Sequence, residues 1–307
     1  MTSDSQSIVD GNSTLVSVGI PAYNEAERLE TAVRQLLSQS YANLELIISD
    51  NASDDQTEAI GRRLGESDSR VVYVRQSRNI GPIANFRYVL EAATGAYFMW
   101  AAPDDEWDPT YVEKNLARLL DDQALVCSVS KVRWIRDGSD AGLTSGTWPL
   151  RGSERKKTGS YLRYARDNSR FYGVFIRDVL LSAYPPRDFF AADIATMLGT
   201  LGHGDHGELD EVLMTRNRND PMGYISMVDS TNTGWLSRWF PMLPLTRYAL
   251  SDLGIPLSPT TVGILLARNI YDHFRYAALH RTPYGAFARL ILKISSRLRA
   301  RAVGDTG

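Results

Sequence analysis

The chain is short of the residues that mark several classes of protein. Its 307 residues include one cysteine, Cys127, which excludes an internal disulfide framework and is typical of a buried thiol in a reducing compartment. Its 34 basic and 36 acidic residues give no global field that would favour nucleic acid as a partner. No apolar run approaches the ~20 residues of a membrane span. Residues 1–13 lack the hydrophobic region of a secretory signal and predict a disordered tail, so we expect a soluble, cytoplasmic protein.

Motifs of several enzyme classes are also missing. No G-x-G-x-x-G follows the first predicted strand, which argues against a dehydrogenase cofactor site, and there is no P-loop. The four histidines, His203, His206, His273 and His280, show no zinc-like spacing with cysteine. The first two fall in the glycine-rich stretch 202–207, which predicts a loop.

Short β-rich runs alternate with helical periodicity from Leu15 to about Leu120. This alternation predicts a mostly parallel sheet covered by helices on both faces. Ser53 or Asp54 is the natural N-cap of the second helix. The expected strands are 15–20, 44–49, 71–75 and 97–101, and the expected helices are 25–38, about 54–64 and 83–93.

Beyond Leu120 the pattern weakens. Residues 125–134 predict a long strand, for which antiparallel pairing is one option, and the Gly-, Ser- and charge-rich segment 137–157 predicts a flexible loop. Further helices are expected at about 159–167, 191–201, 258–280 and 284–302.

The most informative segment is the end of the fourth strand. Its apolar run stops at Pro103, and Asp104, Asp105 and Glu106 follow. A strand end that delivers carboxylates to the edge of a sheet is where an α/β protein holds a divalent metal and the phosphates that the metal neutralises. The alternative is that these acids cap the next helix and face water.

The first three strands end in polar segments as well, at 21–25, 50–55 and 75–81. Because ligands bind at the carboxyl ends of the strands of such a sheet, we expect these segments to form one site with the acidic segment. Asp50 can accept a hydrogen bond from a base, and Arg78 can stack on the base or pair with phosphate. Plain helix capping is the alternative for Asp50 and its neighbours.

In order and spacing, these segments resemble the opening of family 2 glycosyltransferases. The resemblance is strong over about 15–120, patchy to about 218, and absent from the last third. It implies a GT-A fold, in which helices sandwich a Rossmann-like sheet, a nucleotide-diphospho-sugar donor such as a UDP-sugar, Mg²⁺ or Mn²⁺, and inversion at the anomeric carbon. The motifs are Val16–Glu25, Leu44–Thr57, Arg78-Asn79-x-Gly81, and the strand from Gly95-x-Tyr97 to Asp104-Asp105.

The same resemblance assigns roles on the donor side. Asp104 falls on the metal-binding carboxylate of the family's D-x-D motif, whereas Ala102 replaces the first carboxylate; Asp105 is a candidate to compensate. Asp50 would read the base. The full set expected to bind the nucleotide-sugar is Pro21, Ala22, Tyr23, Glu25, Asp50, Asn51, Arg78, Asp104 and Asp105.

On the acceptor side, an inverting transfer needs a general base that deprotonates the attacking hydroxyl. The segment 189–198 resembles the region that carries the family's base, so Asp193 is predicted as that base, with helix capping as the alternative. Arg216 or Arg218 would contact the diphosphate, unless both are simply exposed charges. Trp107 would stack against the sugar or acceptor, whereas Trp100 is expected in the core.

The predicted helix 284–302 carries an apolar stripe and an excess of basic residues. This pattern fits a helix on an anionic membrane surface, which would make the enzyme peripheral on the inner face of the membrane and suit a lipid-linked acceptor. Docking on the chain's own domain predicts the same stripe, and homodimerisation is a third option.

We therefore expect a glycosyltransferase domain at 14–232, with its nucleotide-sugar half at about 14–120 and its acceptor half at about 121–232, followed by a helical extension at 233–303. Two rival functions remain. A sugar-nucleotide pyrophosphorylase would normally carry a glycine-rich basic loop after the first strand, and segment 21–25 is not one. A catalytically silent nucleotide-sugar-binding module of the same fold is favoured by the missing carboxylate at Ala102.

Overall fold

A computed structural model describes residues 14–136, 138–164, 167–218, 222–232, 234–255, 258–279, 288–289 and 293. The predicted tail at 1–13 and most of the predicted helix 284–302 lie outside the described residues.

The first third of the chain follows the predicted alternation of strands and helices, and its four strands are parallel to one another. One predicted cap is wrong. The second helix begins at Thr57 and its N-cap is Gln56, and the Ser53 hydroxyl accepts from the Asn24 amide rather than from the helix. The elements are β1 (Val16–Ala22), α1 (Leu29–Leu37), β2 (Leu44–Asp50), α2 (Thr57–Ser67), β3 (Val71–Arg75), α3 (Pro82–Ala92) and β4 (Tyr97–Trp100).

The middle of the chain adds shorter and longer strands among helices. Its elements are β5 (Glu106–Trp107), α4 (Tyr111–Asp121), β6 (Leu125–Arg136), β7 (Ser139–Leu143), α5 (Glu154–Tyr164), a 3-10 turn η1 (Ser169–Tyr172), β8 (Val174–Ile176), α6 (Arg177–Ala183), α7 (Ala192–Thr200) and β9 (Asp205–Arg218). The helices that follow in the described part of the chain are α8 (Met222–Thr231), α9 (Trp235–Trp239), α10 (Leu243–Ser251) and α11 (Pro259–Leu279).

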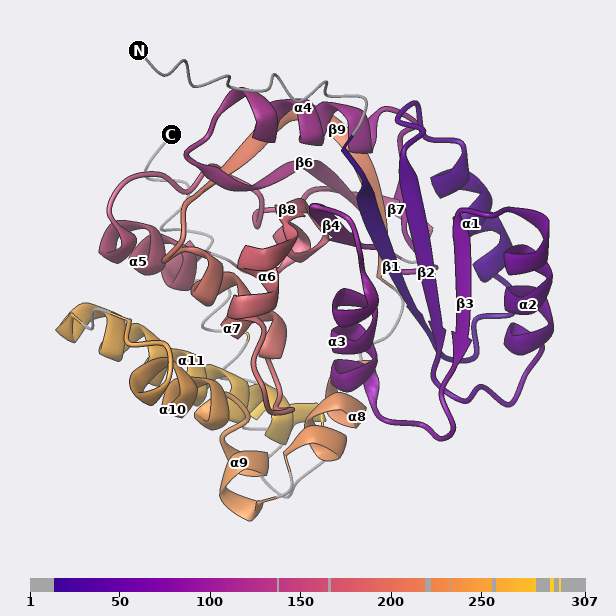
Figure 1. Cartoon of the computed structure of the whole chain (residues 1–307). Helices are drawn as coiled ribbons and strands as arrows, with labels where there is room; N and C mark the ends of the chain where they lie inside the picture. Colours follow the sequence, from indigo (N-terminus) through magenta and orange to yellow (C-terminus); the bar gives the residue numbers. More distant parts are fainter. Residues whose placement is uncertain are drawn as a thin grey trace, which may run out of the picture.

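Within the described residues, the strands form one sheet in the order β3-β2-β1-β4-β8-β6-β9-β5, and β7 pairs with β6 outside this path (Figure 1). Strand β6 is antiparallel to β7 and β8 but parallel to β9. The mostly parallel α/β architecture is therefore confirmed. The antiparallel option for β6 holds for two of its three partners.

Two sequence-based expectations for the middle of the chain are wrong. The segment 137–157 is not one loop, because it contains β7 and the start of α5. The stretch 202–207 leads into β9, where His206 is fully buried and hydrogen-bonded to Thr200 Oγ1 at 3.0 Å. Helices α9 and α10 lie within the segment 233–303, for which the sequence predicts a helical extension without individual bounds there, whereas α8 lies before that segment and is not predicted.

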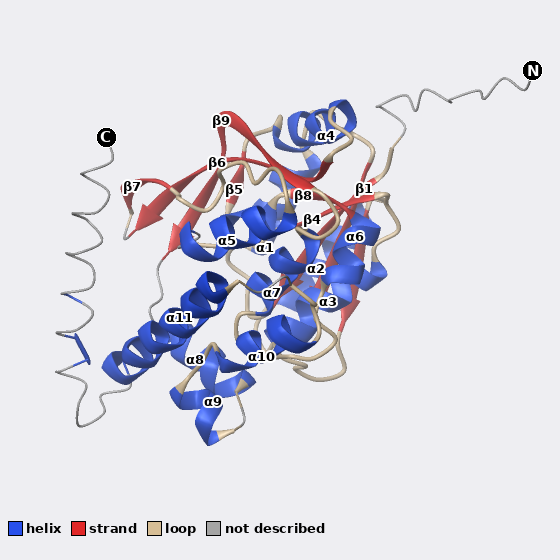
Figure 2. Cartoon of the chain, turned by 90° about the vertical axis from the view of Figure 1, so that its left-hand side faces the viewer, coloured by secondary structure: helices blue, strands red, loops and turns tan. Residues whose placement is uncertain are grey.

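Each face of the sheet carries its own core. On one face, strand residues such as Val18 and Ile48 pack with α1 and α4. On the other, Ile47 and Phe98 pack with α3, α6 and α7, and the same cluster extends to α10 and α11. Figure 2 shows the C-terminal helices gathered below the sheet. The predicted domain boundary at 232 stays a prediction. None of the described helices has the length and apolarity to cross a bilayer.

Trp100, at the end of β4, packs in the core that contains Ile47 and Phe98, just before the acidic segment. Its side chain is fully buried, and its ring stacks on Phe171 with centroids 4.0 Å apart and planes 4° apart. Its indole Nε1 donates to Phe86 O at 3.0 Å, which satisfies the one polar atom of the side chain. The prediction that Trp100 belongs to the core is confirmed.

We predict that Trp100→Ala lowers the free energy of unfolding by about 3–5 kcal/mol, because it removes this stack and leaves a cavity. Urea denaturation followed by circular dichroism measures the change. Trp235→Ala is the control: Trp235 is 75% exposed, so its loss should change stability by about 0.5 kcal/mol or less. Equal effects of the two substitutions would contradict the assignment.

Candidate active site

Two loops at the carboxyl ends of β1 and β2 are tied together. The Asn24 amide donates to Ser53 Oγ at 2.9 Å, and the Glu25 amide donates to Thr57 Oγ1 at 2.8 Å. Asn24 has φ of 56°, in the left-handed region that asparagine tolerates better than most residues. Polar side chains that follow β2 therefore fix the loop that follows β1.

A third loop, after β3, is joined to these by Asn51. Its Nδ2 donates to Asn79 Oδ1 at 3.0 Å, and its Oδ1 accepts from the Ile80 amide at 2.8 Å. Gly81 follows with φ of 84°, a conformation that glycine adopts without steric penalty. Asn51 is buried, and its amide group fixes the loop after β2 to the loop after β3. We call the three loops that follow β1, β2 and β3 the rim of the site.

Asp50, the last residue of β2, has a fully buried side chain. Its Oδ1 accepts from the Ser53 amide at 2.9 Å, and its Oδ2 accepts from the Tyr73 hydroxyl and from Arg75 Nη1, each at 2.7 Å. Burial opposes the charge, but these hydrogen bonds outweigh it and hold the pKa of Asp50 below its ordinary value. These bonds fix the carboxylate in place, and the predicted contact of Asp50 with the base stays a prediction.

The other predicted residues at these strand ends range from exposed to buried. Tyr23 is 47% exposed, and Arg78 is exposed without a carboxylate partner among the described residues. Pro21 is half-buried at the end of β1, next to the buried Ala22. Burial raises the pKa of Glu25, Arg28 lowers it, and Asp104 raises it further. The structure thus brings the end of β1 into electrostatic range of the acidic segment.

The acidic segment after β4 is a tight turn closed by β9. The Asp105 amide donates to Ala102 O at 3.1 Å, and the Asp104 carbonyl accepts from Asn217 Nδ2 at 2.8 Å. Asp105 is 3% exposed, and its Oδ2 accepts from Arg216 Nε at 3.2 Å. Burial raises the pKa of Asp105 to about 7; Asp104 adds to the rise and Arg216 opposes it.

Arg216 lies between the acidic segment and two aromatic rings. Its guanidinium carbon is 4.2 Å from the centroid of Tyr172 and 5.2 Å from that of Trp134. Burial opposes its charge, but Tyr172, Asp105 and Asp104 raise its pKa. The alternative of a plain solvent-exposed charge is wrong for Arg216. Arg218 is the last residue of β9.

Asp193 lies in the first turn of α7, after Ala191, whose φ of 68° is left-handed. Asn168 Nδ2 donates to Asp193 Oδ2 at 2.9 Å, and the Tyr161 hydroxyl donates to Asn168 Oδ1 at 2.7 Å. Burial raises the pKa of Asp193, while the bond from Asn168 and first-turn amides oppose the rise, and Arg216 lowers it from nearby. The carboxylate of Asp193 is thus held by Asn168, which is itself held by Tyr161, within electrostatic range of Arg216.

Trp107 does not lie where an acceptor could stack on it. It is 5% exposed in β5 and packs in the core with Tyr111 and Leu213. The predicted acceptor contact is therefore corrected: the side chain of Trp107 points into the core, whereas that of its neighbour Glu106 is exposed.

The donor set of the site suits a hard cation. No cluster of three His, Cys, Asp or Glu side chains with metal-binding geometry occurs in the described part of the chain. Asp105 Oδ1 is nevertheless buried without a hydrogen-bond partner beside Asp104. Mg²⁺ typically takes one or two protein carboxylates and completes its shell with substrate phosphates and water, so two carboxylates and an orphaned oxygen fit such an ion.

Comparison with known proteins bears directly on this arrangement. The family model described as "Glycosyl transferase family 2" matches residues 17–181, more than half of the chain. The chain belongs to glycosyltransferase family 2. The match spans β1 to α6 and includes the rim and the acidic segment, while Asp193 and Arg216 lie beyond it.

Curated relatives match part of this glycosyltransferase. The chain is 33% identical over 92 residues to a GalNAc(5)-diNAcBac-PP-undecaprenol β-1,3-glucosyltransferase of Campylobacter jejuni, which covers 30% of each protein. It is 32% identical over 102 residues to the Escherichia coli UDP-Glc:α-D-GlcNAc-diphosphoundecaprenol β-1,3-glucosyltransferase WfaP, covering 33% of this chain and 40% of WfaP. The chain thus spans less than half the length of the curated relatives it matches.

Solved structures share the fold. A mannosyltransferase from Pyrobaculum calidifontis, in complex with GDP-Man and Mn²⁺, superposes with a TM-score of 0.55 at 20% identity, covering 92% of this chain and 79% of that one. S. aureus TarS residues 1–349, in complex with UDP-GlcNAc, gives 0.54 at 14% identity, covering 90% and 88%. At these identities the likeness establishes the GT-A fold alone.

Several residues of the site were not foreseen from the sequence. Asn168, Tyr161 and Tyr172 carry no motif, and they come together only through the packing of α5 and η1 against α7 and β9. The one available signal was the Asp-Asn-Ser run at 167–169, a typical turn sequence next to a predicted helix.

We predict a specific pH dependence for Asp105→Asn. The carboxyl of Asp105 has a pKa of about 7 in the folded protein against an ordinary value of 3.8, so its contribution to stability is present below about pH 4 and is lost as the pH rises through 7. From pH 4 to 8, wild type should lose up to about 4 kcal/mol of unfolding free energy relative to the variant. Urea titrations across this range measure the difference; a pH-independent gap would contradict the assignment.

Proposed function

We propose that the chain transfers a sugar from a nucleotide-diphospho-sugar to a saccharide or lipid-linked acceptor, with inversion at the anomeric carbon. The observation that carries this proposal is the placement of Asp193, held by Asn168, within electrostatic range of Arg216, which pairs with Asp105. A donor diphosphate bound at the acidic segment would then present its sugar toward a carboxylate with a raised pKa.

The rim supports a nucleoside pocket. Pro21, Ala22, Tyr23 and Glu25 would line it, Arg78 would border it, and Asn51 would hold its loops in place. The exposed Tyr23 ring and Arg78 guanidinium offer surfaces for stacking on a base. The solved neighbours bind UDP-GlcNAc and GDP-Man, which supports the donor class, and a UDP-sugar is the first donor to test.

A divalent ion, Mg²⁺ or Mn²⁺, would be held by Asp104, with the free Oδ1 of Asp105 available as a second oxygen. When bound, such an ion neutralises the diphosphate of the leaving group. Arg216 adds a fixed positive charge at the same corner, and Arg218 is a further candidate at the end of β9.

Asp193 would act as the general base. It accepts the proton of the acceptor hydroxyl while the acceptor oxygen forms its bond to the anomeric carbon, and the bond from that carbon to the diphosphate oxygen breaks on the opposite face. Asn168 orients the carboxylate, because Tyr161 fixes the Asn168 amide with its NH₂ group toward Asp193.

Asp104→Ala should lower kcat/KM about 100-fold or more, because the metal loses its principal ligand. It should also abolish the rise in Tm that Mn²⁺ adds to that caused by UDP alone. Glu106→Ala is the matched control, since Glu106 is the next acidic residue but is exposed on β5. Full metal-dependent activity in the Asp104 variant would overturn this role.

Asp193→Asn should reduce kcat about 10²- to 10⁴-fold while nucleotide binding, measured by calorimetry, is retained. Turnover of the wild type would distinguish a transferase from a silent binding module. Unchanged kcat in the variant would exclude Asp193 as the base.

Asn168→Ala should move the acid limb of the kcat–pH profile to higher pH. Its hydrogen bond favours the charged carboxylate, so removing it raises the pKa of Asp193 further, and the base is protonated over a wider range. Tyr161→Phe should shift the limb in the same direction by less. A loss of rate with an unmoved limb would argue for a purely structural role of Asn168.

The cellular location is also a proposal: cytoplasmic, and peripheral on the inner face of the membrane through the predicted helix 284–302. The relatives' names specify undecaprenol-linked substrates, which supports a membrane-bound acceptor. Liposome flotation of the chain with and without residues 281–307 tests membrane contact, and equal partitioning of the two forms would exclude this helix as the anchor.

A further inference from the structure

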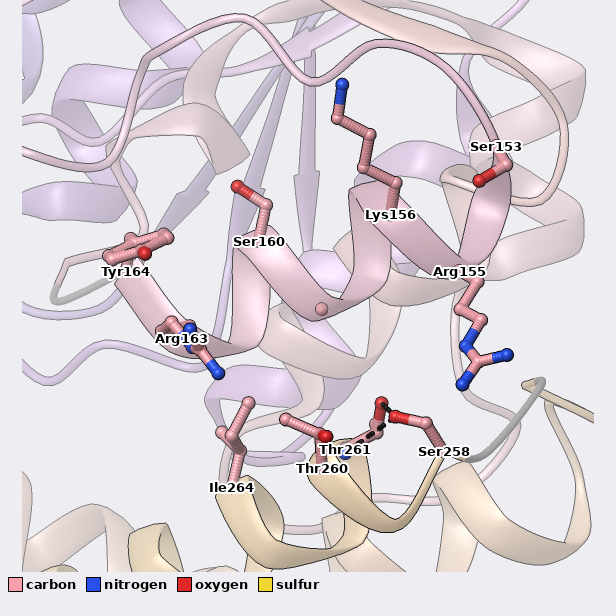
Figure 3. Close-up of a pocket in the computed structure, with 11 residues that line it drawn as sticks. Ser153, Arg155, Lys156, Ser160, Arg163, Tyr164, Ser258, Thr260, Thr261 and Ile264 are labelled. Carbon is pink, nitrogen blue, oxygen red and sulfur yellow. Dashed lines mark hydrogen bonds between the residues drawn. The ribbon is translucent and has the colours of Figure 1, made fainter.

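A cleft of about 440 Å³ lies between α5 and the start of α11, apart from the residues assigned to the transfer reaction (Figure 3). The two helices are joined nearby, where Arg268 Nε donates to Leu162 O at 2.9 Å. None of the described residues that line the cleft is acidic. The cleft is therefore a positively charged feature of the face that carries α5.

Two arginines of α5 give the cleft this charge. Arg155 and Arg163 are eight residues apart, or about 12 Å along a helix, and Figure 3 shows both side chains directed toward α11. Both are exposed, and neither has a carboxylate partner among the described residues. Lys156 adds a third cation at the edge of the cleft. Two unpaired guanidinium groups at this spacing suit an elongated anion rather than a single small one.

Gly159 lies midway between the two arginines. A Cβ added to it would meet no atom within 4 Å, so packing within the described protein does not require glycine there. Glycine in a helix interior is less stable than any other residue except proline. Because glycine has no side chain, it leaves the surface of α5 open between the guanidinium groups of Arg155 and Arg163.

The other walls of the cleft suit a sugar chain. Thr260 is exposed at the start of α11 and offers a free hydroxyl group, whereas Ser258 and Thr261 are buried and bonded to each other at 3.0 Å. Tyr164 is 56% exposed, with the Arg163 guanidinium 6.0 Å from its ring centroid. Hydroxyl groups can bond sugar hydroxyls, an aromatic ring can pack on the face of a sugar ring, and guanidinium pairs with carboxylate or phosphate.

We propose that this cleft binds negatively charged sugar units of the saccharide acceptor, whose anionic groups would pair with Arg155 and Arg163. The proposal rests on the proposed transfer to a saccharide acceptor and adds that the acceptor is an acidic glycan. Helix α5 connects the two sites, because Tyr161 on its inner side donates to the Asn168 that holds Asp193. The cleft would anchor the acceptor away from the reacting hydroxyl.

Isothermal titration calorimetry with hexagalacturonate, an acidic oligosaccharide, tests this binding, and neutral maltohexaose is the ligand control. Wild type should bind hexagalacturonate but not maltohexaose, and more weakly at high salt. The double variant Arg155→Ala/Arg163→Ala should bind at least about tenfold more weakly, because two charge-assisted contacts are lost. Arg247→Ala, which removes an exposed arginine of α10 outside the cleft, should bind as wild type does.

Gly159→Leu distinguishes a loss of ligand binding from a loss of folding stability. Leucine favours a helix more than glycine, so Tm should stay equal or rise, while the added side chain fills this open surface of α5 and abolishes hexagalacturonate binding. Failure of wild type to bind hexagalacturonate, or unchanged binding in the double variant and in Gly159→Leu, would overturn the proposal. Binding to phosphatidylglycerol vesicles without binding to the oligosaccharide would overturn it in favour of a lipid headgroup.

UDP binding is measured on the same samples. A chain that binds and turns over a UDP-sugar but ignores hexagalacturonate would refute the cleft proposal alone. A chain that binds no nucleotide would count against the proposed function instead.

Discussion

The ion pair between Arg216 and Asp105 is the contact on which the arrangement of the site depends. It joins β9, the last strand among the described residues, to the turn that follows β4, and the bond from Asn217 to the Asp104 carbonyl reinforces it. Breaking a buried pair by removing one partner leaves an uncompensated charge, which is strongly destabilising. These two segments, more than a hundred residues apart in the chain, are therefore held together next to the carboxylates of Asp104 and Asp105.

The donor side and the acceptor side of the site are built differently. On the donor side, three successive loops are tied by short-range hydrogen bonds among Asn24, Ser53, Asn51 and Asn79, so that each loop fixes the next. On the acceptor side, the carboxylate of Asp193 depends on Asn168 and Tyr161, which come from other elements. The first kind of order is local, and the second exists only once the helices pack over the sheet.

This difference explains what the sequence could and could not predict. The first four strands and the acidic segment were predictable, because buried apolar runs that stop at polar turns leave a local signal. Strand β9 was missed because its stretch around Glu208–Glu211 is polar and it pairs with β6, far away in the chain. For Asp50 the sequence predicted its place at the end of a strand but not its partners, Tyr73 and Arg75. The burial of Trp107 could not be predicted either, because the exposure of a side chain depends on the whole fold.

Ala191 has a consequence of a different kind. A left-handed backbone costs an ordinary residue about 1–2 kcal/mol, and here it stands two positions before Asp193. The turn into α7 thus stores free energy next to the carboxylate, and surrounding contacts hold it there. Glycine at this position would relieve the strain but leave the backbone before Asp193 freer. Under the proposed role of Asp193 as general base, a gain in stability at this one residue would therefore weaken the orientation of the carboxylate.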